Sequence, residues 1–128
     1  MEGRRQARER ALELLYEAEA KDASPAEIVA ALPAVPDPYA AQLVQGVDTH
    51  RDEIDELLRR FAKGWSLERM PAVDRALLRL ATYELLQQAD VPVGVVISEA
   101  VELASEFSTD DSGRYVNGIL SAIAKRDA

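Results

Sequence analysis

Residues 71–86 read Pro71-Ala-Val-Asp-Arg-Ala-Leu-Leu-Arg-Leu-Ala-Thr-Tyr-Glu-Leu-Leu86, and this stretch decides the fold. It contains no glycine, and its one proline stands where a first helical turn tolerates it. Apolar side chains recur at helical spacing and also cover the flanks of the cylinder. The only interruptions are Asp74, Arg75, Arg79, Thr82 and Glu84. A helix that is apolar on most of its circumference must be surrounded by other helices. The stretch therefore predicts the central helix of an all-α fold.

Helical patterns on both sides of this stretch supply the surrounding helices. The sequence Ser24-Pro25-Ala26-Glu27 is typical of a helix start, with an N-cap serine, a proline at the first position and a glutamate at the third. A longer helical pattern covers residues 39–62, with a kink or a break expected at Gly46 or in the polar run 48–52. Further helices are expected over residues 4–21, 96–107 and 110–123, and Thr109 or an adjacent aspartate is expected to cap the last of them.

Composition narrows the class of protein. A chain of 128 residues with 48% hydrophobic and 30% charged residues suits one globular domain, which we expect to span residues 1–128. The absence of cysteine excludes a disulfide scaffold and thiolate metal sites. No apolar run approaches the ~20 residues of a membrane span, and the N-terminus is charged where a signal peptide is apolar. These features predict a cytoplasmic protein without a membrane segment.

Positive charge is concentrated at the N-terminus of an otherwise acidic chain. The net charge is −8, yet the first ten residues hold four arginines against two glutamates. On a helix, Arg5, Arg8, Leu12 and Tyr16 share one flank, beside the core stripe rather than on it. We therefore expect neither Arg5 nor Arg8 to be needed for folding. The flank is either simply solvated or a small phosphate-binding edge.

The last helical segment offers a second candidate for nucleic-acid contact. Arg114 and Tyr115 place a cation beside an aromatic ring, the pairing that holds phosphate and stacks a base. A purely structural role for the pair stays open. Asn117 and Gly118 are expected to be structural, with an amide that holds the backbone and a close helix crossing.

No catalytic or metal-binding pattern is present. His50 is the only histidine and is expected to face solvent. Trp65 is expected to close one end of the bundle, with a partner contact as the alternative. Glu99, Glu102 and Glu106 lie opposite the apolar stripe of their helix and are expected to form a solvated acidic face. We therefore predict a protein that is not an enzyme and needs no cofactor and no metal.

Several segments, taken together and in order, resemble the NusB family of bacterial transcription antitermination factors. The matching segments are 4–16, 73–79, 83–85, 90–92, 99–104 and 111–118, which cover nearly the whole chain. The resemblance implies two small helical bundles packed together, with about six or seven helices in all. It also implies an adaptor without catalysis that binds boxA RNA with the small-subunit ribosomal protein NusE. The pair then joins the elongating RNA polymerase complex and supports transcription of ribosomal RNA.

Site residues follow from the resemblance position by position. The RNA side would comprise Arg4, Arg5, Gln6, Arg8, Asp111, Arg114 and Tyr115. The side facing the ribosomal protein would comprise Tyr16, Asp74 and Glu84, away from Tyr115. Position 115 is usually phenylalanine in the family, and a tyrosine should still stack. Two alternatives stay open: a homodimer or protein scaffold that does not bind RNA, and a remnant of the N-terminal domain of a ribosomal RNA methyltransferase.

Overall fold

The computed structural model describes residues 2–64 and 66–126, and within these ranges it contains helices and no strand. The prediction for Trp65 lies outside the described residues. The all-α prediction is confirmed. The α-helices are α1 (Glu2–Ala20), α2 (Pro25–Ala30), α3 (Pro38–Thr49), α4 (Arg51–Phe61), α5 (Ala72–Gln87), α6 (Val93–Phe107) and α7 (Asp110–Lys125), with a 3₁₀ turn η1 (Leu67–Arg69) before α5. No helix in the described part of the chain is long and apolar enough to cross a membrane.

Local sequence signals set the helix ends. The Ser24 hydroxyl accepts the Glu27 amide at 3.1 Å, and the Glu27 carboxylate accepts the Ser24 amide at 2.8 Å, so the predicted capping box is confirmed. Thr109 caps α7 through a second reciprocal pair with Ser112. The pattern over residues 39–62 is divided at His50, which ends α3 and precedes α4.

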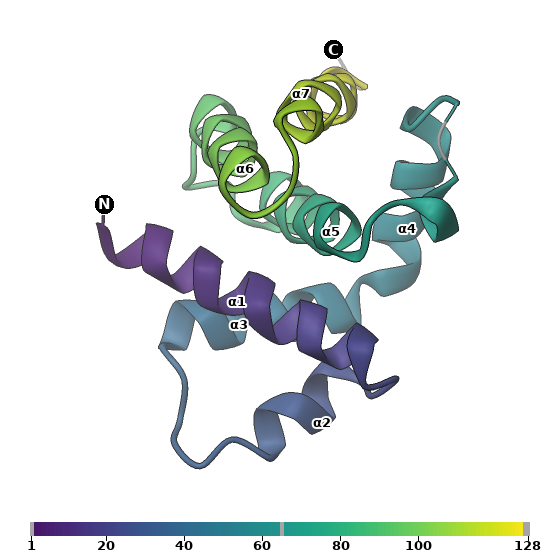
Figure 1. The fold of residues 1–128 in the computed structure, drawn as a ribbon. Coiled ribbons are helices and arrows are strands. Elements are labelled where there is room, and N and C mark those ends of the chain that lie inside the picture. The colour runs from purple at the N-terminus through teal and green to yellow at the C-terminus, as the bar shows by residue number, and fades with distance from the viewer. Residues whose placement is uncertain (1, 65, 127–128) are drawn as a thin grey trace.

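Helix α5 is the centre of the molecule, as the sequence predicts. Its residues from Ala76 to Glu84 are all buried, and Leu80 is only 1% exposed. It contacts α1, α3, α4, α6 and α7. Figure 1 shows α5 between two groups of helices, with α1, α2 and α3 below it and α6 and α7 above it. This arrangement confirms the predicted packing of two small bundles, and one continuous hydrophobic core joins them through α5.

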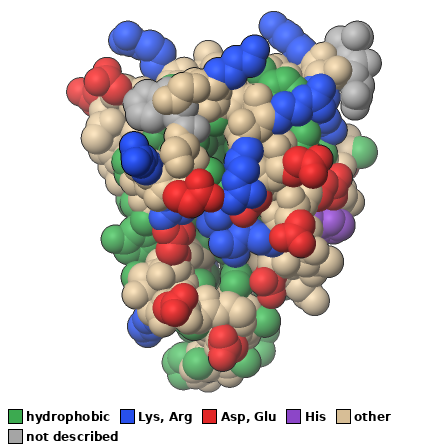
Figure 2. Space-filling view, turned by 90° about the vertical axis from the view of Figure 1, so that its right-hand side faces the viewer, with side chains coloured by type: hydrophobic (Ala, Val, Ile, Leu, Met, Phe, Trp, Pro, Cys, Tyr) green, Lys and Arg blue, Asp and Glu red, His purple; other side chains and the backbone are tan. Residues whose placement is uncertain are grey.

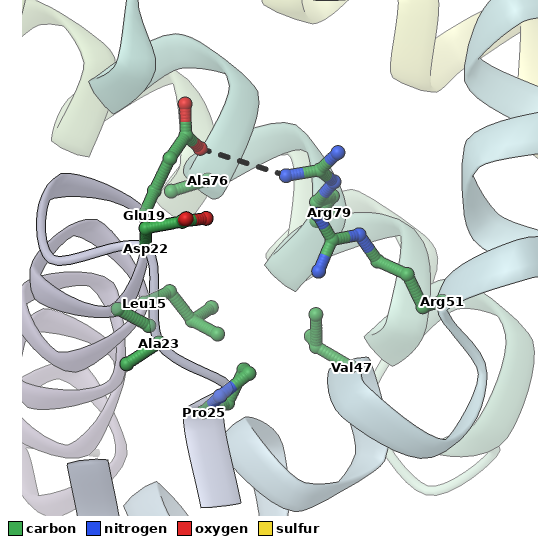
Figure 3. Close-up of a pocket in the computed structure, with 10 residues that line it drawn as sticks. Leu15, Glu19, Asp22, Ala23, Pro25, Val47, Arg51, Ala76 and Arg79 are labelled. Carbon is green, nitrogen blue, oxygen red and sulfur yellow. Dashed lines mark ion pairs between the residues drawn. The ribbon is translucent and has the colours of Figure 1, made fainter. Parts of the chain in front are cut away.

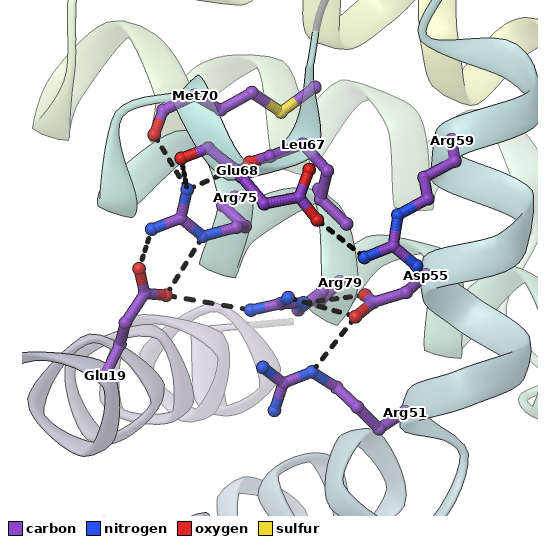
Figure 4. Close-up of polar contacts among 9 residues, drawn as sticks. All are labelled: Glu19, Arg51, Asp55, Arg59, Leu67, Glu68, Met70, Arg75 and Arg79. Carbon is purple, nitrogen blue, oxygen red and sulfur yellow. Dashed lines mark hydrogen bonds and ion pairs between the residues drawn. The ribbon is translucent and has the colours of Figure 1, made fainter. Parts of the chain in front are cut away.

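The polar residues of α5 connect it to its neighbours instead of interrupting it. Arg79 donates two hydrogen bonds to the Asp55 carboxylate of α4, at 2.8 and 3.0 Å (Figure 4). Arg75 donates to the carbonyl oxygens of Leu67 and Met70, both at 2.9 Å, and pairs with Glu19 of α1. Charged groups away from solvent are tolerated where ion pairs and hydrogen bonds satisfy them. Arg75 and Arg79 form such contacts with different neighbouring elements.

Two glycines differ from expectation. Gly46 lies against the ring of Tyr83, where any Cβ atom would overlap the ring, so α3 and α5 approach closely there. Gly118, predicted to allow a close crossing, instead has open space where its Cβ would stand. Asn117 is exposed, and the hydrogen bond that it accepts comes from the Ser121 side chain at 3.5 Å. The predicted structural roles of Asn117 and Gly118 are therefore wrong, because the face of α7 that carries them is turned away from the core.

Candidate functional site

The arginines at the start of α1 are paired with carboxylates. The Arg4 guanidinium lies 3.2 Å from Asp90 and 4.4 Å above the ring centre of Tyr39. Gln6 is exposed. Arg5 pairs with the acidic row of α6, in which it contacts Glu99 at 3.7 Å, Glu102 at 3.3 Å and Glu106 at 3.3 Å. That row was expected to be a solvated acidic face, and this is confirmed for Glu102 and Glu106, whose side chains are 55% and 51% exposed. Glu99 is only 21% exposed, and all three carboxylates also face Arg5.

Arg8 lies in the interior, contrary to the sequence prediction. It is 4% exposed, and its Nε and Nη2 atoms donate to the Glu84 carboxylate at 2.9 and 3.0 Å. The Tyr39 hydroxyl donates to the same carboxylate at 2.7 Å. Helix α1 packs against α2, α3 and α5, so its buried face is wider than the predicted stripe and includes this flank. Burial and the Glu84 hydrogen bond raise the pKa of the Tyr39 hydroxyl well above its usual value.

Asp74 and Tyr115 are in direct contact, although the sequence placed them on separate sides. Asp74 is fully buried, and its Oδ2 atom accepts hydrogen bonds from the Tyr115 hydroxyl and from Ser112 Oγ, the latter at 3.0 Å. The other carboxylate oxygen, Oδ1, is buried without a hydrogen-bond partner among the described residues. The prediction that Asp74 and Tyr115 lie on different sides is wrong, because the start of α7 packs against the start of α5. No local sequence pattern reveals this contact between helices.

A surface hollow brings several predicted residues together beside this contact. It is about 500 Å³ in volume and lies between the start of α5 and the start of α7. Asp111 and Arg114 are exposed at its rim, Tyr115 is half-buried, and Asp74 lies at its floor. Tyr16 is 45% exposed on α1, and none of its described contacts joins it to the hollow.

A groove between α6 and α7 links the two groups of predicted RNA residues. Glu102, which pairs with Arg5, lines this groove together with Arg114. The other lining residues are mostly small: Gly94, Ile97, Ser98, Val101, Ser105, Asp110, Gly113, Asn117 and Ser121. Sequence reasoning missed these residues, since small polar side chains carry no signal until two helices bring their faces together.

A small, partly open cavity of about 140 Å³ lies at the other end of α1 (Figure 3). Arg51 and Arg79 form one wall, and Glu19 and Asp22 approach from α1 and the turn after it. Both arginines already pair with Asp55, so the cavity is part of the ion-pair network of Figure 4. His50 is half-buried rather than fully solvent-facing, with its ring 5.9 Å from that of Tyr83. Residues 2–64 and 66–126 contain no group of three side chains that could hold a metal ion.

The protein is all-helical, with a buried central helix α5. Its candidate binding surfaces are the start of α1, the α6–α7 groove and the hollow beside Asp74. The family model that matches the chain, over residues 5–125, is that of the NusB family. The chain therefore belongs to the NusB family, as its sequence motifs predicted.

Individual relatives support the same assignment. The transcription antitermination protein NusB of Salinispora arenicola is 50% identical over 98% of this chain and 97% of its own length. That of Acidothermus cellulolyticus is also 50% identical, over 100% of this chain and 91% of its own. The family is one of antitermination proteins, so the prediction that the chain is not an enzyme is confirmed.

Solved structures agree with the sequence matches. A structure of T. maritima NusB superposes with a TM-score of 0.86 at 39% identity, covering 95% of this chain and 90% of that one. A structure of the antitermination factors NusB and NusE in complex with dsRNA has a TM-score of 0.84 at 30% identity, covering 98% of each chain.

Proposed function

We propose that this chain is an antitermination factor that binds boxA RNA together with the ribosomal protein NusE. The pair then joins the elongating RNA polymerase complex in the cytoplasm and supports transcription of ribosomal RNA. The observation that carries the proposal is the full-length match to a NusB chain that was solved with NusE and RNA. In this proposal residues 1–128 act as one RNA-binding domain.

The RNA side is formed by α1, the α6–α7 groove and the start of α7. Arg4, Arg5 and Gln6 lie on one edge, and Asp111, Arg114 and Tyr115 lie on the other. Arg114 forms no ion pair with a described residue, so its guanidinium is available to a phosphate. Arg8 contributes indirectly, because its ion pair with Glu84 fixes the helix that carries Arg4 and Arg5.

The chain as a whole is acidic, with a net charge of −8, which suits a basic ribosomal protein. Tyr16 offers an exposed aromatic ring, and the buried Asp74 has a carboxylate oxygen with no hydrogen-bond partner among the described residues. A cationic or amide donor from the partner would satisfy that oxygen. Glu84 is only 2% exposed and is already satisfied by Arg8 and Tyr39, so its part is to position α1 and α3.

A binding assay with an α1 variant tests this proposal. We expect Arg5→Ala to weaken binding of a single-stranded boxA RNA in the presence of NusE, and to reduce the slope of log affinity against log salt by about 0.7. Arg10→Ala is the matched control, since Arg10 is exposed on the same helix and its ion pair among the described residues is with Glu13. An equal loss in both variants, or no RNA binding by the unmodified pair, would overturn the proposal.

A further inference from the structure

The described cations for which no carboxylate partner is found lie on α4, on α7 and in the segment between α4 and α5. On α1, each described Lys or Arg side chain from Arg4 to Arg10 pairs with an acid. Within the described part of the chain, the Lys and Arg side chains for which neither an ion pair nor a hydrogen bond is found are Arg60, Lys63, Arg69, Arg114 and Lys125. All of them belong to α4, α7 or the segment between α4 and α5. The cations that need not give up a carboxylate partner to bind a ligand therefore lie away from the start of α1.

Two of these cations line a groove between α4 and α7. The groove has a volume of about 630 Å³, and its lining includes Arg60, Phe61, Lys63, Tyr115, Gly118 and Ile119. Figure 2 shows Lys and Arg side chains gathered over the upper part of one face, at the height where Figure 1 places the end of α4 and α7. The molecule as a whole carries a charge of −8, so this concentration of cations differs from the average surface.

The lining of the groove also contains two aromatic residues and a glycine. The Arg60 guanidinium stands 5.0 Å from the ring centre of Phe61, a contact that holds it over the ring. The half-buried ring of Tyr115 forms another part of the lining. Gly118 also lines the groove and has open space where a Cβ atom would stand. A positively charged groove with aromatic side chains is the arrangement by which proteins hold the phosphates and stack the bases of a single strand.

We infer that the groove between α4 and α7 is an additional binding surface for single-stranded RNA. A strand that stacks on Tyr115 continues over Gly118, and Arg60 and Lys63 contact its phosphates. Continuity supports this occupant, because Tyr115 lines both this groove and the hollow that holds Asp111 and Arg114. An acidic peptide would match the cations but would leave the aromatic rings and the open floor without a role. The inference rests on the proposed function and extends its RNA path.

The test uses two double variants of the full chain. Arg60→Gln with Lys63→Gln removes the two groove cations. Lys21→Gln with Arg59→Gln is the matched control, since it changes the net charge equally but removes cations that pair with Glu17 and Glu68. Binding of a single-stranded boxA RNA is measured with NusE over a range of salt concentrations, and unfolding curves show whether each variant is folded.

We expect the groove variant to bind the RNA several-fold more weakly and to lose about 1.4 from the salt slope, at ~0.7 for each phosphate contact. The control variant should keep the unmodified slope. RNAs shortened at the 5′ or at the 3′ end locate the contact, because one of them should bind the groove variant and the unmodified protein equally.

Three results would overturn the inference. Equal RNA binding by the groove and control variants would remove the groove from the RNA path while leaving the proposed function intact. Weaker binding of NusE with unchanged RNA binding would make the groove a protein-docking surface. Failure of the unmodified protein to bind RNA, with or without NusE, would overturn the proposed function together with the groove.

Discussion

The Tyr115 hydroxyl donates a hydrogen bond to the buried carboxylate of Asp74. This contact joins a residue proposed for RNA binding to one proposed for partner binding, so the two surfaces share an interaction. A partner donor that reaches Asp74 would act on the same carboxylate that holds the Tyr115 ring in place. Binding at one surface is thereby linked to the position of a side chain at the other.

Tyr115→Phe tests the energy of this contact without removing the ring. The variant leaves a buried carboxylate with one donor fewer, so the free energy of unfolding should fall by about 1–3 kcal/mol. In combination with Asp74→Ala the losses should not add, because the second change removes the same interaction. Urea unfolding of the single and double variants gives the coupling energy.

Tyr16→Phe is the control for that series, since Tyr16 is exposed. Its effect on stability should stay within about 0.5 kcal/mol. Additive losses for Tyr115→Phe and Asp74→Ala would show that the hydrogen bond does not connect the two residues in solution.

Arg8→Ala should unfold the protein far more readily than a neighbouring arginine variant. Removal of Arg8 leaves the Glu84 charge buried, and breaking a buried ion pair in this way costs about 3–5 kcal/mol. Arg10→Ala, on the exposed side of α1, should cost less than about 0.5 kcal/mol. Denaturant unfolding distinguishes the two variants. Equal, small losses of unfolding free energy in the two variants would mean that Arg8 is exposed on the flank of α1 and not buried.

The sequence predicted the architecture because its signals are local. The apolar circumference of residues 71–86 required a surrounded helix, and Ser24 and Thr109 marked helix starts that the structure confirms. The position of the core followed from these patterns. Hydrophobic periodicity and capping depend on neighbours a few residues away, which a single chain displays directly.

Charge pairing could not be predicted in the same way. Arg8 with Glu84, Arg5 with Glu102, and Tyr115 with Asp74 are contacts between helices far apart in the chain. Helical spacing assigns a charged residue to a flank but does not say whether another helix covers that flank. The acidic row of α6 was assigned to solvent, and the arginine flank of α1 to solvent or to a phosphate, yet Arg5 and this row face each other. The binding roles of these residues stay predictions.

Two tyrosines make stability depend on alkaline pH. Burial and hydrogen bonds to carboxylates raise the pKa of Tyr39 and of Tyr115 in the folded state. Their contribution is fully present below the unfolded pKa of about 10 and is lost as pH rises through the folded values, because the unfolded chain ionises first. The free energy of unfolding should therefore decline above about pH 10. Tyr39→Phe should flatten this decline, and an unchanged decline would contradict the assignment.

Gly46→Ala and Gly118→Ala form a matched pair within helices. A methyl group at position 46 overlaps the buried Tyr83 ring, so overpacking should cost about 1–3 kcal/mol. At position 118 the space is open, and alanine should stabilise the helix by about 0.5–1 kcal/mol. Thermal unfolding of both variants is the measurement. A stable Gly46→Ala variant would mean that α3 and α5 are farther apart than described.

The central claim, joint binding of RNA and NusE by this chain, is tested most directly by the affinity for single-stranded boxA RNA with and without saturating NusE. We expect tighter binding in the presence of NusE, by about 5–150-fold for a coupling of ~1–3 kcal/mol, with the chain, NusE and RNA sedimenting as one complex. Equal affinities in both conditions, or displacement of the RNA by NusE or by self-association of the chain, would contradict it.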